Sequence, residues 1–134
     1  MTSLVWDQHA CLPLRTDTSV DPLTRYQRDG GAFVSVNAGY SPHGFRDAVG
    51  LLHHYRAGVE AHPGLELAAS IDDVAQISGA GRIAVVFDLE DSRPLDGDLA
   101  NLATWPASGS GHCCRPTTTP TRPAAAAWTR TTTG

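Results

Sequence analysis

The chain has 134 residues, the length of one domain, with 41% hydrophobic and 18% charged residues. Its formal net charge of −4 at pH 7 argues against a nucleic-acid-binding protein, which would carry a basic face. No apolar run reaches the roughly 18 residues of a membrane span, no secretion signal opens the chain, and three cysteines make no disulfide framework. We therefore expect a soluble, cytoplasmic protein, with its oligomeric state left open.

The first predicted element lies within "LVWDQHACLPL", residues 4–14. Its apolar start predicts a buried strand, which becomes polar at Asp7 and ends at His9. In enzymes built on parallel sheets, the C-terminal ends of the strands carry the catalytic groups. His9 is therefore a candidate metal ligand, and the alternative is a strand-end histidine that bonds to a loop.

Helix and strand patterns alternate in the next part of the chain. Residues 21–31 have a helix-like apolar spacing with a Gly-Gly stop, and residues 32–40 predict a short strand. Residues 41–64 predict a longer helix, with Ser41 as its N-cap and Pro42 at its first position. Each predicted strand is thus followed by a predicted helix.

A second predicted strand also ends on a polar residue, in this case an acid. Ser70 caps a predicted helix at residues 71–81, and residues 82–90 are a continuous apolar run that ends on Glu90. Near-continuous apolar strands that alternate with helices predict an α/β fold with a parallel sheet. Glu90 would then share a sheet edge with the histidine of the first strand, although a solvated strand-end acid is the simpler interpretation.

The composition changes after Trp105. Residues 106–134 contain no Leu, Val, Ile, Phe, Asp or Glu, which predicts a disordered Thr/Pro/Ala-rich tail. The genetic code favours a frameshift as its origin, because every residue there except His112 has a codon with G or C in the middle. Ten arginines and no lysine indicate a GC-rich gene, in which a shifted frame has this bias. Read one base earlier, Cys113 and Cys114 become Leu-Leu in a strand-like "LGVRxLLPTY".

Three motifs carry a resemblance to a known family. "WDQHACLP" is similar to a Trp-Asp-x-His-x-Asp motif, "DGGAFVSVNAGY" to a Gly-Gly-x-Phe-x-Ser-Val strand, and "GRIAVVFDLED" to a strand with a metal-bridging glutamate. Together they make residues 4–105 resemble the N-terminal part of the membrane dipeptidase (renal dipeptidase) family of zinc peptidases. The frame-restored segment resembles the next strand of that family.

The resemblance implies a (β/α) TIM-type barrel with two zinc ions, in which a metal-bound water hydrolyses dipeptides. By position, His9 would be a ligand of one zinc ion and Glu90 the carboxylate that both ions share. Cys11 stands where the family has an aspartate, and a thiolate can also bind zinc. Without a basic partner evident nearby, Cys11 is otherwise interpreted as a small buried residue rather than a nucleophile.

The resemblance also limits the expected activity. Residues 1–105 would supply only the first three βα units of the barrel, without the family's later histidine ligands and substrate-binding residues. We therefore expect a truncated metallopeptidase that is itself inactive, with residues 106–134 as a non-native tail. The competing hypothesis is a small non-enzymatic α/β module whose disordered tail binds partners. An amidohydrolase is disfavoured, because "HAC" lacks the second histidine of a His-x-His motif.

Overall fold

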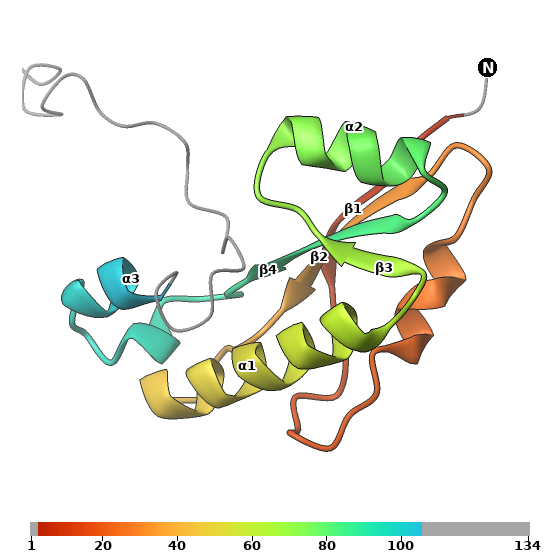
Figure 1. Ribbon diagram of the computed structural model, residues 1–134. Helices are drawn as coiled ribbons and strands as arrows, with labels where there is room; N and C mark the ends of the chain where they lie inside the picture. The colour runs from red at the N-terminus through yellow and green to blue at the C-terminus, as the bar shows by residue number, and fades with distance from the viewer. Residues whose placement is uncertain (1–2, 106–134) are drawn as a thin grey trace, which may run out of the picture.

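Four parallel strands form the centre of the computed structural model, which describes residues 3–105 (Figure 1). They lie side by side in the order β1-β2-β4-β3. Their bounds are β1 Val5–Ala10, β2 Ala32–Asn37, β3 Leu65–Leu67 and β4 Ile83–Asp88. The α-helices are α1 Phe45–Ala61, α2 Ile71–Gly79 and α3 Ala100–Thr104, and the 3-10 helices are η1 Asp21–Tyr26 and η2 Arg93–Leu95. The predicted tail, residues 106–134, lies outside the described residues.

The core has two halves, one on each face of the sheet. Because side chains alternate along a strand, Val34 of β2 and Phe87 of β4 face the same way and pack in the larger half with α1. Phe33 and Val86 face the other way and pack with α2 in the smaller half. Figure 1 accordingly shows α1 and α2 on opposite sides of the sheet. All six residues of β2 are buried, as expected for a central strand of a parallel sheet that is covered on both faces.

Several sequence predictions are confirmed. The sheet is parallel and the fold is mixed α/β, as the apolar strand patterns indicated. The predicted cap of α2 is present, since the Ser70 hydroxyl oxygen accepts a hydrogen bond of 3.1 Å from the Asp73 N–H. The start of α1 was predicted wrongly. The helix begins at Phe45 with Gly44 as its N-cap, beyond a cis peptide bond between Ser41 and Pro42.

The barrel stays a prediction. A (β/α) barrel carries its helices on the outer side of the sheet, whereas α1 and α2 cover opposite faces here. The helix pattern at residues 21–31 corresponds only to η1. Residues 96–105 also have a helix-like sequence, and there the structure has the five-residue α3. The three-residue β3 had no counterpart among the predicted strands, because so short a run has no recognisable periodicity.

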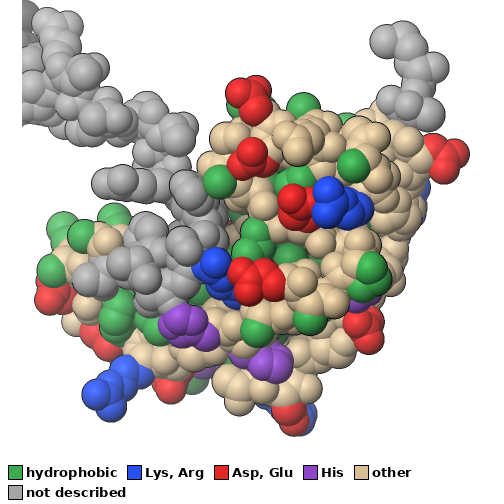
Figure 2. Space-filling view, in the orientation of Figure 1, with side chains coloured by type: hydrophobic (Ala, Val, Ile, Leu, Met, Phe, Trp, Pro, Cys, Tyr) green, Lys and Arg blue, Asp and Glu red, His purple; other side chains and the backbone are tan. Residues whose placement is uncertain are grey.

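The surface carries no strong bias of charge on the face that Figure 2 draws, where acidic and arginine side chains are interspersed. An ion pair joins Arg82, which precedes β4, to Glu66 of β3. Within residues 3–105, no helix has both the length and the apolar character needed to cross a membrane.

Candidate metal centre

The candidate site lies at the C-terminal edge of the parallel sheet, where β1, β2 and β4 end together. His9 is the second-to-last residue of β1, and Asp88 is the last residue of β4. Asn37 is the last residue of β2 and lies directly opposite Asp88 in the strand register. Glu90 follows β4 by two residues and is held there by its N–H, which donates to the Gly39 carbonyl at 3.1 Å. Parallel pairing therefore brings together the polar strand ends that the sequence pattern had placed on one edge.

A bulge in β1 turns His9 toward this edge. Asp7 pairs with Val34 but Ala10 pairs with Val36, so β1 has one residue more than β2 between the two pairs. In a regular strand His9 would share the face of Asp7, over the larger half of the core. The extra residue reverses both positions, so that His9 faces the opposite side and Ala10 lies in the larger half with 3% exposure.

The Asp7 carboxylate stabilises the bulge through two hydrogen bonds. Its Oδ2 accepts a hydrogen bond of 2.6 Å from the Tyr26 hydroxyl of η1, and its Oδ1 accepts one of 3.0 Å from the His9 N–H. The Tyr26 hydrogen bond, followed by that of the His9 N–H, holds the pKa of Asp7 below its ordinary value. The Asp7 carboxylate thus links the backbone at His9 to η1.

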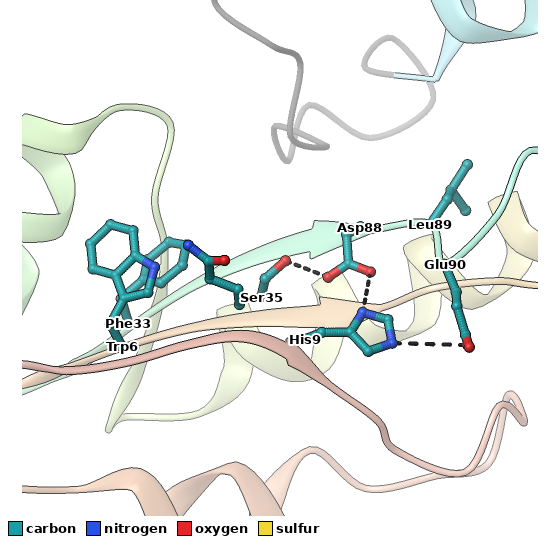
Figure 3. A pocket seen from close by; sticks show the side chains of 8 residues that line it. Trp6, His9, Phe33, Ser35, Asp88, Leu89 and Glu90 are labelled. Carbon is teal, nitrogen blue, oxygen red and sulfur yellow. Dashed lines mark hydrogen bonds and ion pairs between the residues drawn. The ribbon is translucent and has the colours of Figure 1, made fainter.

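The two ring nitrogens of His9 have different partners (Figure 3). Nδ1 lies 3.0 Å from Oδ1 of Asp88, whose Oδ2 accepts a hydrogen bond from the Ser35 hydroxyl. Nε2 lies 3.6 Å from the Cys11 sulfur and 3.9 Å from Oε2 of Glu90. Asp88 is only 15% exposed, against 41% for His9, so the carboxylate is the better buried partner. One nitrogen is therefore anchored, and the other faces two further donor atoms.

Glu90 is positioned by a buried amide. Asn37 is fully buried, and its side-chain oxygen accepts a hydrogen bond of 2.8 Å from the Gly39 N–H. This fixes the orientation of the amide, whose nitrogen donates to Oε2 of Glu90 at 3.1 Å. Gly39 is required here, because a Cβ on it would lie 2.9 Å from the Ala48 Cβ of α1.

The sequence interpretation of Cys11 needs one correction. Cys11 was expected to be buried without a basic partner, but its side chain is exposed and lies beside the His9 imidazole. The reason is that β1 ends at Ala10, so Cys11 is the first residue of the following loop rather than a strand residue. Cys11 also lines a hollow of about 340 Å³ together with Asn37 and Glu90.

His9, Cys11 and Glu90 offer the donor types that zinc binds, but their side chains are not gathered into a ready-made site. Zinc takes nitrogen, sulfur and oxygen ligands at about 2.0–2.3 Å, so two ligands of one tetrahedral ion lie roughly 3.3–3.6 Å apart. The separation of 3.6 Å between His9 and Cys11 meets this spacing, and the 3.9 Å to Glu90 requires a small rotation of a half-exposed side chain. No group of three or more His, Cys, Asp or Glu side chains stands ready to hold a metal ion within residues 3–105.

A larger hollow of about 580 Å³ adjoins these donors on the face of the sheet that carries α2, and Phe33 belongs both to its wall and to the smaller half of the core. One end is polar, with His9 and Glu90, and the other is aromatic (Figure 3). Trp6 stacks on Phe33 there with ring centroids 4.0 Å apart, and Trp6 is 44% exposed. The site thus combines polar donor atoms with an apolar wall, as small-molecule sites usually do.

The residues of the site that sequence reasoning missed are Ser35, Asn37 and Asp88. Ser35 and Asn37 are alternate polar positions in an otherwise apolar buried strand, and this alternation was a usable signal. Asp88 was overlooked because Glu90, two residues later, was taken as the acidic end of the strand. Comparison with protein-family models, with curated proteins and with solved structures finds no match to this chain.

Proposed function

We propose that this chain belongs to a zinc-dependent dipeptidase of the membrane dipeptidase type. The (β/α) barrel that the resemblance also implies would need α1 and α2 on one face of the sheet, whereas they cover opposite faces here. In this proposal residues 3–105 contribute one zinc-binding cluster, formed by His9, Cys11 and Glu90, and no complete catalytic centre. The observation that carries it is the position of His9 Nε2, which faces the Cys11 sulfur and the Glu90 carboxylate at the C-terminal strand edge. The same three residues follow from the sequence resemblance.

Each side chain has a definite part in this proposal. His9 binds through Nε2, Cys11 through its thiolate and Glu90 through Oε2, while Asn37 keeps the Glu90 carboxylate directed at the cluster. A zinc pair in such enzymes supplies a Lewis acid and an activated water. The aromatic wall of Trp6 and Phe33 offers an apolar surface for a dipeptide side chain.

Metal titration tests the cluster. We use the full chain with Cys113→Ser and Cys114→Ser, so that Cys11 is its single thiol. Cobalt(II), a spectroscopic substitute for zinc, is expected to give a sulfur-to-metal charge-transfer band that Cys11→Ser abolishes. His9→Ala should weaken zinc binding in calorimetry by more than the 10–100-fold that loss of an outer-shell partner costs.

The matched control is His53→Ala, an exposed histidine of α1 outside the cluster, which should bind zinc as the parent does. Zinc binding that is unchanged in both His9→Ala and Cys11→Ser would contradict the proposal. The non-enzymatic α/β module would then be the better description of the chain.

Hydrolysis is the second test. Because a dinuclear mechanism needs two metal ions and a bound water, and the described cluster offers donors for one ion, we expect no dipeptide hydrolysis above background. The measurement is release of amino acids from a set of dipeptides by the zinc-loaded full chain. Hydrolysis that disappears with a chelator and with His9→Ala would show a complete active centre and contradict the single-cluster proposal.

A further inference from the structure

The Asp88 carboxylate is the most enclosed charged group of the site, and both of its oxygens have partners. Oδ2 accepts from the Ser35 hydroxyl, and Oδ1 lies 3.0 Å from Nδ1 of His9. Both Ser35 and Asp88 lie in paired strands, so the backbone holds them in place. His9, on the exposed edge strand β1, therefore meets a pre-positioned acceptor.

This contact decides where the His9 ring carries its proton. A carboxylate only accepts hydrogen bonds, so a neutral His9 that bonds to Asp88 has its proton on Nδ1. Nε2 then has a lone pair, and that lone pair faces Cys11 and Glu90. A neutral imidazole free in water favours the opposite tautomer, with the proton on Nε2. The Asp88 contact thus reverses the intrinsic preference of the ring.

We propose that Asp88, supported by Ser35, is a positioning residue that holds His9 as the Nδ1–H tautomer with its Nε2 lone pair directed into the cluster. The tautomer itself depends only on the contacts described above. Its consequence for zinc rests on the proposed function, since partners of this kind typically contribute 10–100-fold to metal affinity. No residue of the sequence resemblance marks Asp88 for this role.

The experiment is long-range nitrogen–proton NMR of the His9 imidazole in the metal-free full chain, at about pH 8.5, where an ordinary imidazole is neutral. The parent should show the pattern of an Nδ1–H tautomer. Asp88→Ala should move the ring to mainly Nε2–H and weaken zinc binding 10–100-fold. Asp88→Asn should retain much of the Nδ1–H form, because its amide oxygen still accepts a hydrogen bond.

The control variant is Asp72→Ala, which removes an equal charge from the exposed first turn of α2 and should change neither reading. Ser35→Ala gives a milder probe should Asp88→Ala fail to fold, and should shift the tautomer partway. A parent spectrum with Nε2–H, or an unchanged spectrum in Asp88→Ala, would overturn the inference. An Nδ1–H parent that binds no zinc through His9 would support the tautomer assignment and overturn the proposed function instead.

Discussion

Replacement of Phe87 by alanine is expected to lower the free energy of unfolding by about 3–5 kcal/mol. Phe87 lies in the central strand β4, is fully buried in the larger half of the core, and stacks on Tyr55 of α1 with ring centroids 6.4 Å apart. Its removal leaves a cavity between sheet and helix that β4, paired on both sides, is poorly able to close. Natural domains have only about 5–15 kcal/mol of stability, so this variant should be marginal.

The measurement is urea unfolding of the full chain followed by circular dichroism. Leu99→Ala serves as the control, because Leu99 is 77% exposed and its truncation should change stability by no more than about 0.5 kcal/mol. Equal unfolding curves for the two variants would contradict the placement of Phe87 between β4 and α1.

The second large effect is a loss of stability in alkali through Tyr55. Burial of this side chain, which has no exposed surface, raises its pKa from 10.0 to about 12, and its hydroxyl donates to the Pro13 carbonyl at 2.8 Å. Below pH 10 the phenol is neutral in both the folded and the unfolded chain, so stability is unaffected. Between pH 10 and 12 only the unfolded chain ionises, which stabilises it by up to about 2.7 kcal/mol.

Stability measured by urea unfolding at intervals from pH 9 to 12 should therefore fall more steeply for the parent than for Tyr55→Phe. The variant should lose about 1 kcal/mol at neutral pH, because one hydrogen bond to the Pro13 carbonyl is lost. Tyr40→Phe, a change at a 41% exposed side chain, should follow the parent throughout. Parallel curves for the parent and Tyr55→Phe would rule out the expected ionisation.

The sequence predicted the parts of this fold that depend on local pattern. Apolar runs identified β2 and β4, because central strands of a parallel sheet are buried on both faces, and Ser70 identified the start of α2. The first strand was also found where it was predicted, but its predicted burial was wrong, because β1 is an edge strand in which only Ala10 is buried. The prediction of where α1 starts failed. Ser41 and Pro42 have the right chemistry for a helix start, yet they lie in the preceding loop. Local preference is a weak guide where the surrounding loop decides the backbone path.

The site was predictable only in part, for a similar reason. His9 and Glu90 were identified by their positions at strand ends, which is a property of the chain itself. The Asp88 contact to His9 depends on the bulge between β1 and β2, and therefore on pairing between segments far apart in sequence. Strict alternation along β1 would have placed the His9 ring over the larger half of the core, away from Asp88.

The bulge also bears on which changes of length this protein tolerates in evolution. Deletion of Gln8 would return β1 to regular pairing, with His9 still facing the site and Ala10 still facing the core. A deletion within β2 or β4, which pair without interruption, would instead invert every side chain beyond it. The first strand can therefore exist in two lengths that present the same histidine, and relatives one residue shorter there would keep the same chemistry.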